Sequence, residues 1–322
     1  FGSCLIMLNL ASLRVKLSAG VFLALLLSSC SWMNKASTTP SATNKYVVAE
    51  DNGFFQISTD GNSWVAIKPA ESEIWNSLSL SNNKIIAVGM SGAISDSSDG
   101  VNWNPVLIKD HRVWLYDITY AKTQYIAVGM GGLVIGSPTL KNWQRKVVPT
   151  RSWLSSVSYG NQTLVASGAG GVLLASRDGG NTWVAESSPT EEWLSSVRFI
   201  NQRFIAVGSG GTVLSSMDGH GWESHVSATK KWLYTVSYGN DKYLAAGANA
   251  SVVSSRDGVN WHVLRTNLPP QETIRSMIFA NQKFWIVGSH GLIANSSDGV
   301  DWRITQLNTS HGLNSIVYFD TP

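Results

Sequence analysis

The sequence predicts an all-β fold made of seven copies of one four-stranded unit. The first observation is a series of tryptophans that recur every 39 to 41 residues, at Trp64, Trp103, Trp143, Trp183, Trp222, Trp261 and Trp302. The second is that six of them close a short phrase built around Asp-Gly, such as Ser255-Arg-Asp-Gly-Val-Asn-Trp261. The third is the alternation of apolar and polar residues between the phrases, which is typical of strands. A fixed period near forty residues, with four short strands per copy, is the signature of a β-propeller blade.

The copy between Trp153 and Trp183 illustrates the four strands. An alternating segment over 153–159 ends at the turn dipeptide Gly160-Asn161, and a second strand over 163–167 leads into the glycine cluster at 168–171. A third strand is expected over 172–176 and a fourth over 183–186. Glycine-rich turns and period-2 patterning leave no room for a helix of useful length.

The number of blades follows from counting strands of each kind. Second strands begin at Tyr46, Ile85, Tyr125, Leu164, Phe204, Tyr243 and Phe284, and first strands begin near Trp75, Trp114, Trp153, Trp193, Trp232, Ile274 and Leu313. Because the repeats start with a second strand and end with a first strand, the last strand can complete the blade that opens the domain. This pairing would close the ring and remove the edges that invite aggregation. We therefore expect seven blades over 46–319 and a short tail at 320–322.

Composition and charge fit a turn-rich repeat protein. The 322 residues include 29 glycines and 14 tryptophans, and only 14% are charged. The formal net charge is +3, and no basic stripe is visible. We therefore expect no nucleic-acid partner. A monomer is expected, since ring closure leaves no strand edge for a second copy.

The segment before the repeats has the pattern of an export signal. After residues 1–6, which we interpret as upstream of a start at Met7, Arg14 and Lys16 precede an apolar run over 19–27 that is too short to span a bilayer as a mature helix. The run ends in Leu27-Ser28-Ser29-Cys30, which resembles the lipobox of bacterial lipoproteins. That resemblance implies removal of 1–29, lipidation of Cys30 and a bacterial cell-envelope location, at the outer membrane or periplasmic face. Residues 30–45, rich in Ser, Thr and Asn, are expected to form a flexible tether. The alternative is an ordinary secretory signal that ends in cysteine.

The Asp-Gly phrase has a physical rationale, because an aspartate can accept hydrogen bonds from the backbone of a turn and glycine tolerates positive φ. The phrase resembles the Asp-box, or bacterial neuraminidase repeat, whose pattern is Ser-x-Asp-x-Gly-x-x-Trp. The copy from Ser176 to Trp183 fits fully, five others are one residue shorter, and the copy from Ser137 to Trp143 lacks both Asp and Gly. The resemblance implies a propeller in which the motif is structural and lies away from the ligand face. It assigns a structural role to Asp60, Asp99, Asp178, Asp218, Asp257 and Asp298.

Asp-box propellers include sialidases and glucanases, so a glycoside hydrolase is the alternative function. Sialidases resemble one another in an arginine triad, a tyrosine nucleophile paired with a glutamate, and an Arg-Ile-Pro phrase, and this sequence contains no such phrase. The one longer connection, at 267–273, offers a single acid, Glu272. The six histidines lie far apart and show no metal-ligand spacing. We therefore expect no catalytic residue, no metal and no cofactor.

A second tryptophan series offers a binding surface. These tryptophans open innermost strands, and charged residues of varying sign precede several of them. In a propeller the connections from fourth to first strands surround the mouth of the central channel, so the series could bind a protein, a peptide or a glycan. The alternative is that the rings fill space between blades. The candidate partner-binding residues are Trp75, Arg112, Trp114, Arg151, Trp153, Glu192, Trp193, Lys231 and Trp232.

A lipidated seven-bladed Asp-box propeller also resembles the photosystem II assembly factors, which are non-enzymatic chaperones of membrane-protein maturation. Most phrases of this chain are one residue shorter than the full box of that group. The resemblance implies a membrane-tethered binding or assembly scaffold without chemistry of its own.

Overall fold

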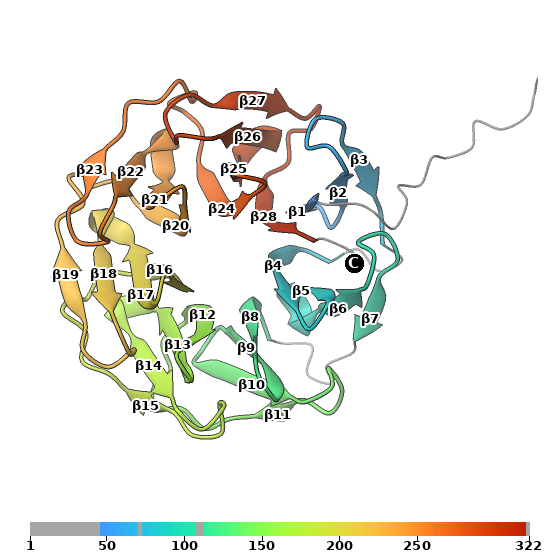
Figure 1. The fold of residues 1–322 in the computed structure, drawn as a ribbon. Helices are drawn as coiled ribbons and strands as arrows, with labels where there is room; N and C mark the ends of the chain where they lie inside the picture. Colours follow the sequence, from blue (N-terminus) through green and yellow to red (C-terminus); the bar gives the residue numbers. More distant parts are fainter. Residues whose placement is uncertain (1–45, 70–72, 107–112, 320–322) are drawn as a thin grey trace, which may run out of the picture. The chain divides into compact units, whose positions relative to one another are not determined.

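The computed structural model describes residues 46–69, 73–106 and 113–319, which form seven four-stranded antiparallel sheets arranged as blades around a central channel (Figure 1). The predicted signal, lipidated cysteine and tether over 1–45, the candidate Arg112 and the tail at 320–322 lie outside the described residues. The predicted seven-bladed propeller is confirmed. No helix in the described ranges is long and apolar enough to cross a membrane.

The strands of each blade follow one another from the channel to the rim of the ring. From innermost to outermost, blade 1 consists of β28 (Leu313–Tyr318), β1 (Tyr46–Glu50), β2 (Phe55–Ser58) and β3 (Val65–Ile67). Blade 2 consists of β4 (Trp75–Ser81), β5 (Lys84–Gly89), β6 (Ile94–Ser97) and β7 (Asn104–Val106). Blade 3 consists of β8 (Leu115–Ala121), β9 (Gln124–Gly129), β10 (Leu133–Ser137) and β11 (Gln144–Arg145). Blade 4 consists of β12 (Leu154–Gly160), β13 (Thr163–Gly168), β14 (Leu173–Ser176) and β15 (Val184–Ala185).

The remaining blades repeat the same order. Blade 5 consists of β16 (Leu194–Ile200), β17 (Arg203–Gly208), β18 (Val213–Ser216) and β19 (Glu223–His225). Blade 6 consists of β20 (Leu233–Gly239), β21 (Lys242–Gly247), β22 (Val252–Ser255) and β23 (His262–Val263). Blade 7 consists of β24 (Ile274–Ala280), β25 (Lys283–Gly288), β26 (Leu292–Ser296) and β27 (Arg303–Gln306). Single 3-10 turns follow the second strand of five blades, as η1 (Met90–Gly92), η2 (Ala169–Gly171), η3 (Ser209–Gly211), η4 (Ala248–Ala250) and η5 (Ser289–Gly291).

The two ends of the repeat region close the ring, as the offset of the strands predicted. Strand β28 pairs antiparallel with β1, and the register places Tyr46 opposite Tyr318 and Val47 opposite Val317. Blade 1 is therefore built from both ends of the domain (Figure 1).

Four predicted strand starts are one residue too early. Trp114, Trp153, Trp193 and Trp232 each stand just before the innermost strand of their blade, whereas Trp75 is the first residue of β4. Ladder pairing begins at the leucine that follows each of the four, for example at Leu194 opposite Gly208. The four tryptophans therefore belong to the connections at the channel mouth rather than to the sheets.

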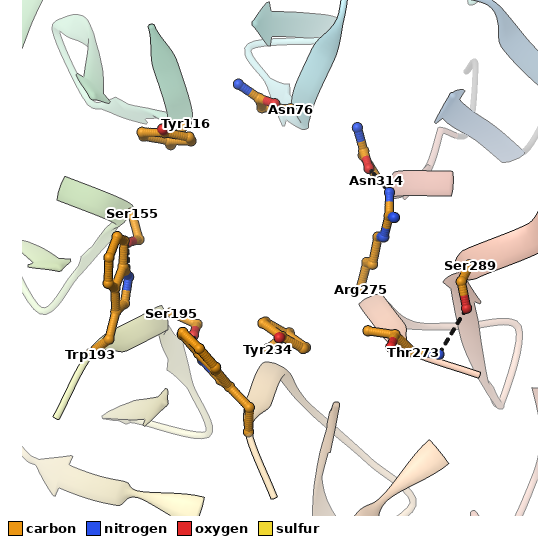
Figure 2. A pocket seen from close by; sticks show the side chains of 11 residues that line it. Asn76, Tyr116, Ser155, Trp193, Ser195, Tyr234, Thr273, Arg275, Ser289 and Asn314 are labelled. Carbon is orange, nitrogen blue, oxygen red and sulfur yellow. Dashed lines mark hydrogen bonds between the residues drawn. The ribbon is translucent and has the colours of Figure 1, made fainter. Parts of the chain in front are cut away.

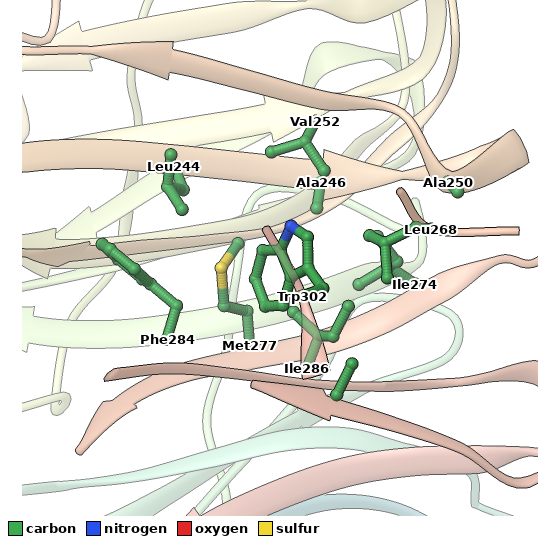
Figure 3. Packing of buried hydrophobic residues seen from close by; sticks show 11 residues of the cluster. Leu244, Ala246, Ala250, Val252, Leu268, Ile274, Met277, Phe284, Ile286 and Trp302 are labelled. Atoms are coloured by element: carbon green, nitrogen blue, oxygen red, sulfur yellow. The ribbon is translucent and has the colours of Figure 1, made fainter. Parts of the chain in front are cut away.

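The hydrophobic core lies between neighbouring blades rather than in one central cluster. Between blades 6 and 7, Leu244, Phe284 and Ile286 pack around the indole of Trp302 (Figure 3). Strands of these blades have side chains buried on both faces, as expected for sheets stacked face to face. Each blade therefore depends on its two neighbours for burial of its apolar surface.

The Asp-Gly phrases form turns between the third and fourth strands. At Asp257, Oδ1 accepts the backbone N–H groups of Val259 and Asn260 at 2.9 and 2.8 Å, and Ser255 Oγ donates to the same oxygen at 2.9 Å. The N–H of Asn260 is the main reason that the pKa of Asp257 is lowered. The phrase that lost both Asp and Gly keeps the turn, because Leu140 takes the glycine position with a φ of 64° and its carbonyl accepts the indole N–H of Trp143 at 3.1 Å.

Candidate functional site

Every innermost strand carries a β-bulge at its second residue. In blade 5, for example, Leu194 pairs with Gly208 and Ser196 with Val207, so Ser195 has no partner in the ladder. A bulge bends the strand and redirects the side chain of the extra residue. The seven bulge residues are Asn76, Tyr116, Ser155, Ser195, Tyr234, Arg275 and Asn314.

All seven bulge residues line one cavity of about 550 Å³, which we call the upper cavity, together with Trp193, Trp232, Thr273 and Ser289. The cavity lies at the end of the channel where the innermost strands begin (Figure 2). Its volume is in the range of small-ligand sites. The fold thus brings one residue of each blade to a single site.

An aromatic arc runs along one side of this cavity, and we define it as Tyr116, Trp153, Trp193, Trp232 and Tyr234. Four of its residues line the cavity, and Trp153 lies beside them. The centroid of Tyr116 lies 6.1 Å from that of Trp153, which lies 5.8 Å from that of Trp193. Trp193 lies 6.3 Å from Trp232, which stacks on Tyr234 at 5.5 Å. The five rings thus form an unbroken series across blades 3 to 6.

The two cavity-lining tryptophans are held in place by hydrogen bonds to the preceding blade. The indole N–H of Trp193 donates to Ser155 Oγ at 2.7 Å, and that of Trp232 donates to Ser195 Oγ at 2.6 Å. Both serines are bulge residues, and their small side chains leave room for the ring of the next blade to lean over them. The positions of these rings are therefore fixed before any ligand arrives.

The opposite side of the cavity is a polar sector, which we define as Asn76, Arg275 and Asn314. Figure 2 shows Arg275 and Asn314 across the cavity from Trp193. Arg275 Nη1 donates to Asn314 Oδ1 at 2.5 Å and lies 3.4 Å from Asp51 Oδ2. The amides of Asn314 and Asn76 donate to the carbonyls of Trp75 and Leu115, each at 2.8 Å.

The two tyrosines of the arc are uncharged at neutral pH. Burial raises the pKa of the Tyr116 phenol. Burial also raises the pKa of Tyr234, and the positive charge of Arg275 offsets part of that rise. Both hydroxyls therefore keep their protons.

The candidate residues named from the sequence have different positions. Trp193 and Trp232 line the cavity, and Trp153 is 40% exposed beside them. Trp114 is 38% exposed and does not line the cavity. Trp75 is only 3% exposed and stacks on Phe55 at 5.7 Å, so it fills space between blades. The charged candidates Arg151, Glu192 and Lys231 are exposed on the connections outside the cavity.

Sequence reasoning missed the bulge residues. A signal was present, because the position after the apolar residue that opens each innermost strand holds Asn, Tyr, Ser, Ser, Tyr, Arg and Asn in successive blades, counted from Asn76 to Asn314. The positions on either side are far more uniform. Variation at one fixed place in a repeat is the mark of a surface that discriminates between partners.

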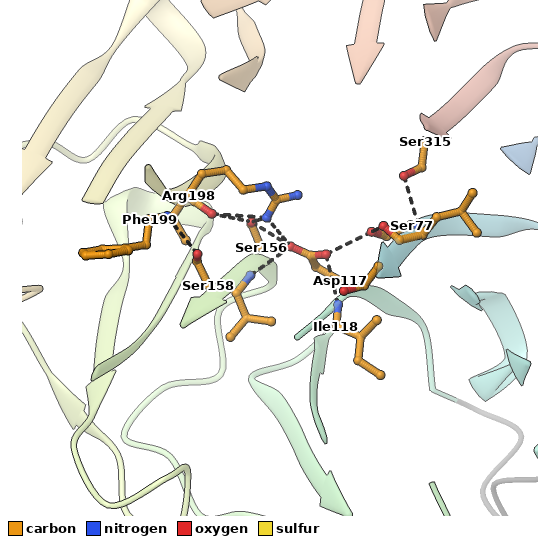
Figure 4. Close-up of polar contacts among 12 residues, drawn as sticks. Ser77, Asp117, Ile118, Ser156, Ser158, Arg198, Phe199 and Ser315 are labelled. Atoms are coloured by element: carbon orange, nitrogen blue, oxygen red, sulfur yellow. Dashed lines mark hydrogen bonds and ion pairs between the residues drawn. The ribbon is translucent and has the colours of Figure 1, made fainter. Parts of the chain in front are cut away.

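The second cavity, of about 210 Å³, lies further along the channel and contains a buried acid, Asp117. Other blades have Ser or Thr at this position. Asp117 accepts the hydroxyls of Ser77 and Ser156 at 2.9 and 2.8 Å, and pairs with Arg198 Nη1 at 2.8 Å (Figure 4). The carboxylate thus joins blades 2 to 5, and its oxygens are fully occupied.

Glu272, the acid of the longer connection, is also buried and bonded. Its Oε2 accepts the hydroxyl of Ser289 at 2.5 Å and lies 3.2 Å from His290 Nδ1. Glu192 accepts a hydrogen bond from the hydroxyl of Ser209 in the same way, so the same contact occurs in two blades.

None of the residues that line the upper cavity carries a carboxylate. In the part of the chain that the structure describes, no cluster of His, Cys, Asp and Glu is placed to hold a metal ion.

The six aspartates of the Asp-Gly phrases lie far from the cavity. Because adjacent strands run in opposite directions, the connections from third to fourth strands lie at the end of the blades opposite the channel mouth. The six aspartates accept hydrogen bonds within their own turns. Asp178, for example, accepts them from Ser176 Oγ at 2.8 Å and Thr182 Oγ1 at 2.7 Å.

Comparison with known proteins supports the fold. A family model described as the DUF6242 beta propeller domain matches residues 234–318. Among curated proteins, no sequence matches this chain. Solved structures share its fold. A structure of YCF48 bound to D1 peptide is 14% identical, with a TM-score of 0.64, and the match covers 81% of this chain and 96% of that one.

Two further solved structures give the same result. YCF48 from Cyanidioschyzon merolae is 14% identical with a TM-score of 0.62, over 79% of this chain and 98% of that one. The RRP9 WD40 repeats are 10% identical with a TM-score of 0.62, over 76% and 84%. At such identities the similarity shows the propeller fold alone.

Proposed function

We propose that this protein is a non-catalytic scaffold that binds a peptide segment of a partner protein in the upper cavity. The observation that carries the proposal is the two-sided cavity mouth, in which the aromatic arc faces the polar sector. Half-buried aromatic side chains beside an arginine match the residue types that dominate binding hot spots. The similar fold of YCF48, solved with D1 peptide, supports a peptide as the ligand.

The proposal extends to the location of the scaffold. The Leu27-Ser28-Ser29-Cys30 phrase supports a lipid anchor in the bacterial cell envelope, at the outer membrane or periplasmic face. The bonding within the turns supports assignment of the six Asp-Gly phrases to the Asp-box. Under this proposal the propeller acts as a monomer, and the cavity mouth is the face that receives the partner.

A tiled peptide array tests this function. The purified full chain is incubated with an array of overlapping peptides from envelope proteins, beside the variants Trp193→Ala and Trp114→Ala. We expect specific spots whose affinity falls at least about tenfold in Trp193→Ala, since truncation of a central aromatic anchor costs about 2 kcal/mol or more. Trp114→Ala is the matched control, because Trp114 also stands just before the innermost strand of its blade but lies outside the cavity.

Two results would contradict the proposal. An array with no spot above the level of Trp193→Ala would refute peptide binding. Turnover in a glycan-hydrolysis screen would instead favour the glycoside hydrolase. Thermal melting of both variants checks that the ring is intact.

A further inference from the structure

The aromatic arc offers ring faces and hydroxyl donors. The indole N–H groups of Trp193 and Trp232 are already bonded to Ser155 and Ser195. Each serine hydroxyl accepts one of these bonds, so its own proton is left to donate. A ligand on the arc therefore meets aromatic faces flanked by two O–H donors.

The polar sector also offers mainly donors. Arg275 carries five N–H groups, and only its Nη1 is bonded to Asn314 and Asp51 among the described residues. Asn314 Oδ1 already accepts one hydrogen bond from Arg275, and Asn76 Oδ1 is the other amide acceptor of the sector. The absence of carboxylates from the cavity lining makes acceptors scarcer still.

Such a cavity matches a ligand that is rich in carbonyl groups and poor in N–H groups. A proline residue supplies a carbonyl, has no backbone N–H, and carries an apolar ring that packs on aromatic faces. Proline-rich segments adopt the polyproline II helix, whose carbonyls have no internal partner and whose rise is about 3.1 Å per residue.

From these matches we infer that the cavity is selective for proline-containing peptide segments in the polyproline II conformation. This inference rests on the proposed peptide-binding function and specifies its ligand. Proline rings lie on the faces of Trp193 and Trp232, while the peptide carbonyls accept hydrogen bonds from Ser155, Ser195 and Arg275. Such a segment is stiff before it binds, so little conformational entropy is lost in the cavity.

A glycan fits the same site less well. Each sugar hydroxyl donates as well as accepts a hydrogen bond, so a bound glycan needs acceptors on the protein. Carboxylates are the strongest acceptors of that kind, and none lines the upper cavity. A buried hydroxyl left without an acceptor costs binding free energy.

Isothermal titration of the full chain with blocked six-residue peptides tests the inference. The probes are acetylated and amidated hexaproline, hexaalanine and hexasarcosine, the last of which lacks both N–H groups and rings. Chitohexaose serves as the glycan probe. We expect hexaproline to bind at least about tenfold more tightly than hexaalanine, with hexasarcosine between them.

Three variants locate the binding. Trp193→Ala should weaken hexaproline binding at least about tenfold. Ser195→Ala should weaken it about fivefold, because one hydroxyl donor and the acceptor that holds the indole of Trp232 are both lost. Trp114→Ala should leave it unchanged, and thermal melting checks the fold of each variant.

Several results would overturn the inference. Hexaalanine or chitohexaose binding as tightly as hexaproline would remove proline selectivity, as would hexaproline binding that survives Trp193→Ala. Failure of this inference is distinguishable from failure of the proposed function. Array peptides that lack proline yet depend on Trp193 would sink proline selectivity alone, whereas an array with no Trp193-dependent spot would sink both.

Discussion

Asp60 shows how a single side chain organises a turn. Its Oδ1 accepts the backbone N–H groups of Asn62 and Ser63, both at 2.8 Å, while Ser58 Oγ accepts the N–H of Gly61 at 2.8 Å. The N–H of Ser63 and then that of Asn62 lower the pKa of Asp60 to about 2. The charged carboxylate is therefore the form that the folded turn prefers.

The lowered pKa of Asp60 predicts acid sensitivity of the turn. A carboxyl whose pKa falls on folding stabilises the protein above its unfolded value of 3.8, and this contribution is lost as the pH falls toward 2. Asp60→Asn should cost about 0.5 kcal/mol at pH 7, a small effect because the group is exposed to solvent. The difference in urea midpoint between wild type and variant should shrink between pH 4 and pH 2. A difference that stays constant across this window would contradict the prediction.

At the scale of the element, the bulge explains the glycine that ends the second strand of blades 2 to 7. Gly208 has extended backbone with a φ of −168°, so its conformation suits any residue. A Cβ at this position would lie 1.9 Å from the carbonyl oxygen of Trp193, which bonds to the N–H of Ser209 at 2.8 Å. The glycine is therefore required by close approach of the two chains beside the bulge.

Gly208→Ala should disrupt both the sheet and the cavity. The added methyl must push the bulged strand away, and overpacking of this kind costs about 1–3 kcal/mol. Gly221→Ala is the matched control, because a Cβ there meets nothing within 4 Å. Urea denaturation should show a lower midpoint for Gly208→Ala and a change below about 0.5 kcal/mol for Gly221→Ala. Equal midpoints would show that the close contact relaxes without cost.

The same bulges mark the limit of prediction from the sequence. The tryptophan period and the strand offset predicted the seven blades and the pairing of β28 with β1, since both follow from pattern alone. Period-2 patterning cannot reveal a bulge, so it placed Trp193 in a strand and gave no role to Ser195 or Arg275. Trp193 and Trp232 were named among the candidates because they repeat, whereas Arg275 was missed because it occurs once.

At the scale of the molecule, stability depends on closure of the ring. Each apolar cluster lies between two blades, so a gap anywhere exposes the faces of both neighbours. In blade 1 the ring is closed by noncovalent pairing of β28 with β1, where Ala49 lies opposite Ser315. Leu313, Ile316 and Val317 of β28 are all buried at this junction.

Removal of β28 should therefore unfold the protein. Truncation after Gly312 takes away the buried side chains of Leu313, Ile316 and Val317, of which the leucine and the isoleucine are each worth about 2–5 kcal/mol by comparison with truncation to alanine. Their sum is comparable to the whole stability of a typical domain, about 5–15 kcal/mol. Removal of β28 also leaves β1 with an unpaired edge. We expect the truncated chain to lack a cooperative thermal transition by circular dichroism.

A circular permutant separates loss of closure from mere rearrangement of the termini. Residue 319 is joined to residue 46 by a short linker, and the chain is opened at the turn between Ile200 and Arg203, which pair at the ends of β16 and β17. Blade 5 is then closed between its first and second strands, just as blade 1 is in the natural order. Because every pairing is kept, the permutant should melt within a few degrees of the parent chain over 46–319. A truncated chain that melts like the parent would show that the pairing of β28 with β1 is not needed to hold the ring together. A permutant that fails to fold would show that keeping every strand pairing is not enough to hold it together.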